Sequence, residues 1–458
     1  MLITILAGLF ILSVVIIVHE FGHFIVAKKS GIFVKTFSVG FGRKLIKKRI
    51  GETVYTVSML PFGGYVKFAG ESEDPDAAQE APRGGDTLEI DDSQIDPKRY
   101  FVNKSPLVRG AVVFAGPFSN YVLALVIYLG IFSLYGVEVL PFTTIGSVEA
   151  GSPAAVAGLE PMDKIVAVDG EAVDTWRSLQ QKLIDDMETP KTLTVDRAGR
   201  SFDTEFEATT EDGYIVLGFE PHLPPTLGGV KRDGPAYRAG IRQGDTIISI
   251  NDTTVTSYDE IARIIHAKPE EALYIVWDHE GVQHADSITP EAKKVLKAGS
   301  ETEFEVVGQI GVGAFYTIQR MPVLDAAAAS FNFSNALVVK IVVFLKQFFL
   351  GRLGMDAVGG PILITQMAGE MARWGFDRLL YFLAFFSINL CIFNLLPVLP
   401  FDGGHLTLFL YEGVMRRKVN KRVREILTQA GFILLILLMA FVVLVDVSRC
   451  AGGGPRLF

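Results

Sequence analysis

An apolar run that contains a cluster of polar residues is the strongest constraint on this chain. Leu2 to Ala27 is long enough to cross a bilayer as a helix, at about 1.5 Å per residue over roughly 30 Å of hydrocarbon. Near its end it carries HEFGH, His19 to His23, which places two imidazoles one turn apart on one helix face, where both can bind one zinc ion. Glu20 follows the first of them and is placed to take a proton from an attacking water.

Ionisable side chains inside hydrocarbon each cost about a few kcal/mol unless they are paired or bound to a metal, so this cluster predicts a functional site. The alternative is a helix whose polar residues only bind neighbouring helices. The run lacks the basic n-region of a cleaved signal peptide, and we therefore expect it to stay in the protein as a transmembrane helix.

Composition places the chain among polytopic membrane proteins. Its 458 residues are 49% hydrophobic, with a mean hydropathy of +0.34, and the apolar residues gather in long runs between soluble segments. The net charge of −8 gives no reason to expect nucleic-acid binding. Cys391 and Cys450 are the two cysteines, too few and too far apart for a disulfide framework or a cysteine metal site.

Four runs predict transmembrane helices, over residues 1–27, 107–135, 376–404 and 428–447. The segment after the first run is strongly basic, with Lys28, Lys29, Lys35, Arg43, Lys44, Lys47, Lys48 and Arg49. The positive-inside rule therefore puts this segment in the cytoplasm and the N-terminus outside.

Residues 325–375 decide the rest of the topology. The stretch from Phe331 to Leu350 is apolar but interrupted by Lys340 and Lys346. If it crossed the membrane, the third run would end outside. If it lies in the interface as an amphipathic helix, the third run ends in the cytoplasm, next to a basic loop over 405–427. We prefer the interfacial placement because that loop contains Arg416, Arg417, Lys418, Lys421, Arg422 and Arg424.

The cytoplasmic segment 28–106 contains a β pattern just after the first helix. Two strand-like runs flank the turn Pro61-Phe62-Gly63-Gly64, and the second begins with Tyr65 and Val66. We predict a membrane-associated β-hairpin with an edge strand near the metal, although an ordinary surface hairpin fits the pattern equally well. The acidic stretch from Glu71 to Pro97 is typical of a solvated loop.

An internal repeat lies between the second and third spans. The pattern Ser152-Pro153-Ala154, Ala157-Gly158-Leu159, Asp163 and Ile165 recurs with constant offset as Gly234-Pro235-Ala236, Ala239-Gly240-Ile241, Asp245 and Ile247. We predict two α/β domains over 141–225 and 226–310, outside the cytoplasm. They resemble PDZ domains of bacterial proteases, and this resemblance implies binding of extended peptides or chain termini by strand addition. A spacer or wedge is the alternative.

Two histidines need a third protein ligand if zinc is to keep one open position. The predicted topology brings Asp402, at the cytoplasmic end of the third span, to the depth of His19 and His23. His405 competes, since zinc also binds imidazole readily. A carboxylate in this apolar setting otherwise lacks a partner, which favours Asp402.

These motifs together resemble the site-two protease family of intramembrane zinc metalloproteases, specifically its bacterial regulator-of-sigma-E (RseP) type. The matching segments cover most of the chain: HEFGH, GFG (Gly40 to Gly42), PFGGYVKF (Pro61 to Phe68), AGP (Ala115 to Pro117), the tandem PDZ-like repeats, VGGP (Val358 to Pro361) and NLLPVLPFDGGH (Asn394 to His405). The implied fold is a polytopic α-helical membrane protein with four transmembrane helices, the β-hairpin and two extracytoplasmic PDZ-like domains.

The resemblance also implies the site residues. His19, His23 and Asp402 would bind Zn²⁺ and Glu20 would be the catalytic base. Substrate would contact Asn389 and Asn394, and it would pair with the segment that contains Gly63, Gly64, Tyr65 and Val66.

The implied function is an intramembrane zinc endopeptidase that cleaves single-span membrane proteins of the anti-sigma-factor type, with signal-peptide remnants as a further substrate class. Cleavage would follow a first extracytoplasmic cut, as in regulated intramembrane proteolysis. A PDZ-bearing membrane scaffold without catalysis is the alternative. A transporter is a third possibility, but the chain shows no inverted repeat of its spans.

Overall fold

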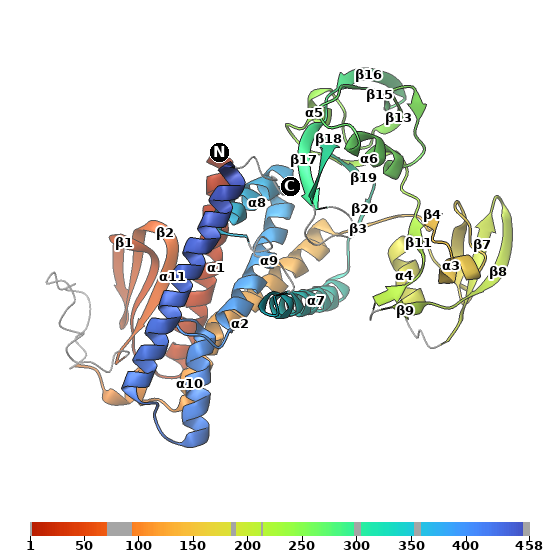
Figure 1. The fold of residues 1–458 in the computed structure, drawn as a ribbon. Helices are drawn as coiled ribbons and strands as arrows, with labels where there is room; N and C mark the ends of the chain where they lie inside the picture. Colours follow the sequence, from red (N-terminus) through yellow and green to blue (C-terminus); the bar gives the residue numbers. More distant parts are fainter. Residues whose placement is uncertain are drawn as a thin grey trace. The chain divides into compact units, whose positions relative to one another are not determined.

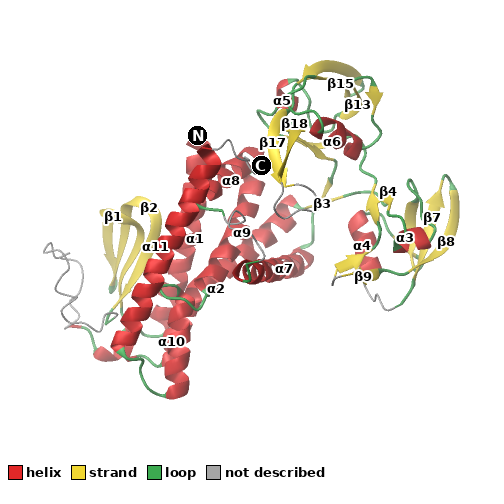
Figure 2. Cartoon of the chain, viewed as in Figure 1, coloured by secondary structure: helices red, strands yellow, loops and turns green. Residues whose placement is uncertain are grey.

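The computed structural model describes residues 2–70, 94–184, 189–211, 214–296, 304–351 and 359–451. Most of the predicted acidic loop and of the C-terminal AGGGPRLF lies outside these ranges. The chain divides into a helical unit, formed by the two ends of the sequence, and a mainly β unit from Tyr135 to Arg320 (Figures 1 and 2).

The helical unit is built on long apolar helices. They are α1 (Leu2–Lys29), α2 (Pro106–Gly130), α7 (Val323–Phe349), α8 (Pro361–Trp374), α9 (Phe376–Asn394), α10 (Asp402–Met415) and α11 (Lys421–Ala451), with short 3-10 turns at Pro97–Arg99 and Phe101–Asn103 and a π-turn at Ile131–Tyr135. Most of their apolar side chains stay on the surface of the unit, as expected where lipid is the solvent.

Five helices among the described residues are long and apolar enough to cross a membrane: α1, α2 with its π-turn, α7, α9 and α11. Four of them match the predicted spans. The fifth, α7, falls where we predict an interfacial helix, and its composition alone allows a crossing. In Figure 1, α7 is seen nearly end-on while α1 and α11 are seen along their length, so it runs crosswise to them. The interfacial placement stays a prediction.

The third predicted span differs from the structure at its end. The helix α9 stops at Asn394, and α10 begins at Asp402 after a non-helical connection. Pro397 and Pro400 lie in this connection, and proline cannot donate the backbone hydrogen bond that would continue a helix. The predicted loop 405–427 is largely helical, because α10 extends to Met415 and α11 starts at Lys421.

A sheet packs beside α1 (Figure 1), formed by β1 (Val34–Ile50) and β2 (Thr53–Phe68). Both elements fold back on themselves, so that Val34–Val39 pairs with Gly64–Phe68 along one edge and with Val54–Val57 along the other. The predicted hairpin is corrected accordingly: its two runs flank a third strand and do not pair with each other. The sequence pattern indicates strands but not their partners. The strand Val34–Val39 was not predicted, because it lies in a segment that was interpreted only by its basic charge.

The β unit contains two lobes, each with its own core. The first lobe comprises β4 (Ile145–Val148), α3 (Pro153–Val156), β5 (Lys164–Val168), β6 (Glu171–Ala172), α4 (Trp176–Ile184), β7 (Lys191–Arg197), β8 (Arg200–Phe206), β9 (Thr209–Glu211), β10 (Tyr214–Val216) and β11 (Phe219–Pro221). The sheet order is β6-β5-β7-β8, and β11 closes the lobe by pairing with β4.

The second lobe repeats this plan. It comprises β12 (Leu227–Val230), α5 (Pro235–Arg238), β13 (Thr246–Ile250), β14 (Thr253–Thr254), α6 (Tyr258–His266), β15 (Leu273–His279), β16 (Val282–Ile288), β17 (Glu291–Leu296), β18 (Phe304–Gln309) and β19 (Val312–Ala314). The sheet order is β14-β13-β15-β16, and β12 pairs with β19, so the lobe continues past the predicted end at 310. Outside both lobes, β3 (Val137–Val139) pairs with β20 (Thr317–Gln319).

The repeated aspartates have equivalent positions in the two lobes. Asp163 accepts a hydrogen bond from the backbone of Glu160 and binds Arg197, with 2.7 Å from Nε to Oδ1. Asp245 accepts from the backbone of Arg242 and binds His279, with 2.6 Å from Nδ1 to Oδ1. Each carboxylate therefore fixes the turn before the first central strand of its lobe, but the cations that neutralise them differ.

Candidate metal centre

The helix α1 brings His19 and His23 to one point. They lie one turn apart, as the motif spacing requires, and their Nε2 atoms are 3.2 Å apart. Asp402, the first residue of α10, places Oδ2 3.1 Å from Nε2 of His19 and 3.6 Å from Nε2 of His23. The three ligand atoms lie within 4.8 Å of one another. The structure thus brings together all three predicted ligands from opposite ends of the chain.

These donor atoms fit a zinc ion. Oδ2 of Asp402 is buried and has no hydrogen-bond partner of good geometry among the residues that the structure describes. A buried carboxylate oxygen without a partner is costly, and here it faces two imidazole nitrogens that can each offer a lone pair. Two imidazoles and one carboxylate form a three-ligand set that leaves zinc a fourth position.

The other ring nitrogens are held by α2. Nδ1 of His23 donates to the backbone carbonyl of Val112 at 2.9 Å, which leaves Nε2 free to bind a metal. Nδ1 of His19 lies 3.3 Å from the side-chain amide of Asn120, whose Oδ1 has no other partner within the described ranges. If the amide is turned so that Oδ1 accepts from Nδ1, both groups are satisfied and Nε2 of His19 is also free for a metal.

Glycines let α1 and α2 approach closely at this level. A Cβ added at Gly116 would lie 2.4 Å from both Cε1 and Nε2 of His23 and 2.9 Å from Cε1 of His19. One added at Gly22 would lie 2.2 Å from the carbonyl oxygen of Ala115. Both distances are shorter than real contacts allow, so no other residue fits there without movement. The AGP motif therefore forms one wall of the site.

The sheet edge passes beside Glu20, which is half-buried. A Cβ added at Gly64 would lie 3.5 Å from Cγ of Glu20, so the strand that begins at Gly64 runs alongside the predicted base. Tyr65 and Val66 continue this strand through pairing with Ser38 and Phe37. Within the described residues, no strand covers its outer edge.

The other predicted site residues have contacts of their own. Asn389 donates to the carbonyl of Phe385 on its own helix at 2.9 Å, and Asn394 is the half-buried last residue of α9. His405 does not belong to the ligand group among the described residues, and its ring packs near Phe409 instead.

Sequence reasoning missed the supporting role of α2. Neither Asn120 nor the backbone carbonyl of Val112 belongs to a motif that can be recognised in the sequence. The available signal for Asn120 was a fully buried amide in an apolar run, which must find a hydrogen-bond partner.

Comparison with known proteins identifies the family of the chain. The model of Peptidase family M50 matches residues 7–438. A regulator of sigma-E protease, RseP, from Salmonella typhimurium is 31% identical, covering 96% of this chain and 97% of the relative. The protein of that name from Escherichia coli K12 is 29% identical, with 96% and 97% covered. A protein provisionally named a zinc metalloprotease, from Vibrio cholerae, is 32% identical, with 97% and 98% covered.

Among solved structures, the PDZ domain of an SdrC-like protein from Listeria monocytogenes is 24% identical, covering 21% of this chain and 90% of that domain. Its TM-score of 0.17 is too low to support an assignment. The family match and the relatives, in contrast, extend over nearly the whole sequence and confirm the predicted resemblance. This chain belongs to peptidase family M50 and is a zinc metalloprotease of the membrane.

Proposed function

We propose that the chain is an intramembrane zinc endopeptidase that cleaves single-span membrane proteins of the anti-sigma-factor type after a first extracytoplasmic cut. The observation that carries this proposal is the convergence of Nε2 of His19, Nε2 of His23 and Oδ2 of Asp402 between apolar helices, beside a strand edge that no other described strand covers. The names of the sigma-E protease relatives support the substrate class.

His19, His23 and Asp402 would hold the zinc ion, with Asn120 and Val112 orienting the two rings. Bound zinc supplies Lewis-acid chemistry, since it polarises a carbonyl and increases the acidity of water. Glu20 neighbours the ligands without joining their group, and its carboxylate is placed to take the proton of the attacking water and to pass it to the leaving amine.

A transmembrane substrate is helical, so its carbonyl groups are already engaged in hydrogen bonds and must be released before attack. The strand Gly64–Phe68 is paired on one side, with Val34–Val39, and its outer edge can pair with an extended peptide. Strand addition would replace the backbone hydrogen bonds that the substrate helix loses. Because Gly64 lies beside Glu20, a peptide paired here would pass close to the base.

The topology completes the proposal. The basic segments after α1 and α10 support a cytoplasmic location for the metal-centre end of α1. We propose accordingly that the chain lies in a bacterial inner membrane with its N-terminus in the periplasm. The two lobes then lie in the periplasm, where we propose that they act as PDZ-like substrate filters that admit trimmed chains. The scaffold alternative is weaker, because a scaffold has no need for a complete ligand set and an adjacent carboxylate.

The test is cleavage of a model single-span substrate by the purified protein. Glu20→Gln should retain zinc and lose about a hundredfold or more of the cleavage rate, the usual effect of removing a general base. Cleavage by this variant at nearly the wild-type rate would rule out Glu20 as the base.

The ligand assignment is tested by metal analysis of two matched variants. Asp402→Ala should lose most of its zinc, while His405→Ala should keep it, because His405 stays outside the ligand group. The reverse result would transfer the ligand role to His405.

A further inference from the structure

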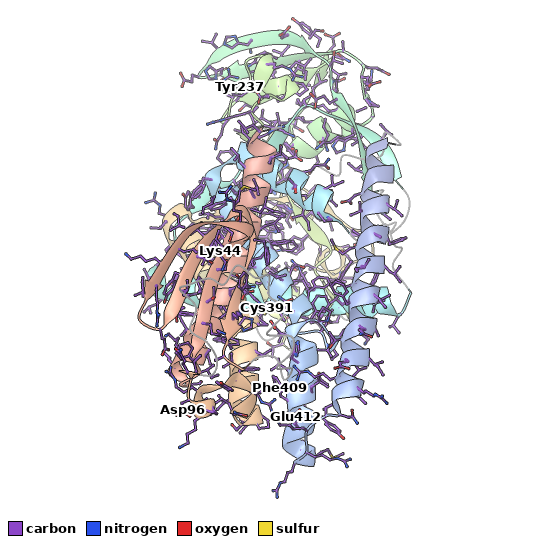
Figure 3. All side chains as sticks on the ribbon, turned by 90° about the vertical axis from the view of Figure 1, so that its left-hand side faces the viewer. Lys44, Asp96, Tyr237, Cys391, Phe409 and Glu412 are labelled. Carbon is purple, nitrogen blue, oxygen red and sulfur yellow. The ribbon has the colours of Figure 1, made fainter. Side chains whose placement is uncertain are left out.

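A cavity lies in the helical unit, and its lining includes none of the three predicted metal ligands. It has a volume of about 1050 Å³ and is formed by residues 102–105, the first turns of α2, the last turns of α10 and residues 416–418. Figure 3 labels Phe409 and Glu412 of α10, which line it. Neither the proposed mechanism nor the sheet uses this groove.

The groove changes from apolar to basic along its length. The helices α2 and α10 pack together, and the start of α2 and the end of α10 share one end of the groove. Its apolar walls begin beside the mouth with Leu107 and Val414, which are 87% and 71% exposed, and continue through Leu410, which is 68% exposed, to Phe114 and Leu406. Its mouth carries Lys104, Arg416, Arg417 and Lys418. Apolar side chains this exposed are suited to contact with hydrocarbon.

The depth of the groove matches one leaflet of a bilayer. Phe114, at the apolar end, lies two residues before Gly116, which touches the ligand histidines. Pro106, at the basic end, is about 12 Å from Phe114 along the helix axis. The basic mouth is therefore expected at the cytoplasmic surface, and the apolar part lies at the level of the metal centre.

The positive charge at the mouth is available for an anion. Arg109 forms the floor of the groove, where its charge is neutralised by Glu412 at 2.5 Å and its guanidinium lies 4.6 Å from the ring centre of Phe409. Lys104, Arg416 and Arg417 make no ion pair with an acidic group in the part of the chain that the structure describes. The N-terminus of α2, which opens into the same mouth, adds its partial positive charge.

We propose that this groove binds an anionic phospholipid of the surrounding bilayer. The phosphate lies among Lys104, Arg416 and Arg417, and the acyl chains follow the apolar walls toward the metal centre. Basic pockets between membrane helices on the cytoplasmic side are suited to anionic head groups. The apolar walls are suited to the chains, and the two features have the order that a lipid has in the inner leaflet. A zwitterionic lipid would contact the same apolar walls, but its head group would be attracted much less strongly by the basic residues at the mouth.

The test measures lipid bound to the purified intact protein by native mass spectrometry, with phosphatidylglycerol and phosphatidylcholine compared at equal concentration. The double substitution Arg416→Gln and Arg417→Gln removes two charges at the mouth. It should weaken phosphatidylglycerol binding by about 25-fold, at about fivefold for each basic residue near an anionic membrane surface. The matched control is Arg43→Gln with Lys48→Gln, two exposed basic residues of β1, which should bind like the wild type.

A second variant tests the apolar walls and leaves every charge in place. Among the described residues, a Cβ added at Gly413 would meet only Cβ of Pro106, at 3.9 Å, so Gly413→Leu fits on the helix and extends into the groove. It should also lose phosphatidylglycerol. The proposal is overturned if both lipids bind equally to the wild type, or if the control pair loses as much binding as the mouth pair. It is also overturned if Gly413→Leu still binds normally, or if inorganic phosphate alone displaces the lipid.

Discussion

Replacing Gly116 by alanine tests whether the wall of the metal centre is as tight as the structure indicates. The added methyl group would lie 2.4 Å from Cε1 and Nε2 of His23 and 2.9 Å from Cε1 of His19, whereas ordinary contacts begin at 3.4 Å. The difference at His23 is about 1 Å, and one of the crowded atoms is the nitrogen that would bind zinc. The helices cannot easily separate, because Gly22 of α1 already meets the backbone of α2.

The expected loss follows from these distances. Zinc–nitrogen bonds of about 2.0–2.1 Å tolerate shifts of only about 0.2 Å, so a ring displaced by about 1 Å leaves the first coordination shell. A misplacement of this size costs about a hundredfold in rate. Overpacking adds about 1–3 kcal/mol of destabilisation. The higher helix propensity of alanine offsets part of this destabilisation, since alanine is favoured over glycine by about 1 kcal/mol within a helix.

The assay is zinc content after dialysis against a graded chelator, together with cleavage of a single-span substrate. Gly130→Ala is the matched control, because it makes the same change on α2 with no atom of the described residues within 4 Å of the new Cβ. We expect Gly116→Ala to lose zinc and activity and Gly130→Ala to keep both. Wild-type zinc affinity and rate in Gly116→Ala would show that the close contact does not constrain the site.

Three further predictions follow from other parts of the chain. Asn120→Ala should weaken zinc binding by about 10–100-fold in chelator competition, while Asn120→Asp, which keeps an acceptor for Nδ1 of His19, should retain it. The carboxylate of Asp245 raises the pKa of His279. The ion pair of these two residues therefore stabilises the second lobe fully below about pH 6.5, and this stabilisation is lost as the pH rises through the raised pKa. Hydrogen exchange of the intact protein, corrected for intrinsic rates, should show this loss of stability in the second lobe alone, because Arg197 keeps its charge in the first lobe. The variant His279→Arg should show no such loss with rising pH. Deleting both lobes should leave cleavage of short-tailed substrates intact and permit cleavage of untrimmed ones, measured by gel assay; a stable, zinc-bound deletion that still cuts only trimmed substrates would place selectivity in the membrane helices.

The ligand set was predictable because it depends on short-range spacing and on depth. His19 and His23 share a helix face by the periodicity of the helix alone. For Asp402, the charges on the loops fix the direction of each span, which places this residue at the same depth. A carboxylate in an apolar setting also needs a partner, which favours Asp402 over His405. No contact between side chains had to be known for this prediction, and the structure brings the three donor atoms together.

The sheet and the outer contacts of the ligands could not be obtained in this way. Strand patterns identify β1 and β2 but do not reveal that Val34–Val39 lies between the two halves of β2. The contacts of Gly116 and Asn120 with the histidines depend on how α1 and α2 are rotated against each other, and α2 has no motif that records this rotation. A buried amide in an apolar run indicates that a partner exists, without identifying it.

Asp446 shows the same limit in the last helix. A lone aspartate at the end of the apolar run of α11 needs a partner, and its exposed fraction is only 2%. Its carboxylate accepts hydrogen bonds from the backbone N–H groups of Gly360, Ile362 and Leu363, at 3.1, 3.1 and 3.3 Å. These groups begin α8 and have no partner within that helix, and hydrocarbon provides no water for them. A Cβ at Gly360 would lie 2.4 Å from Oδ2 of Asp446. Gly360, the second glycine of the VGGP motif, is therefore required by a carboxylate more than eighty residues later in the chain. This contact links α11, which is otherwise largely exposed, to α8, and α8 packs against α1, the helix that carries the two histidines.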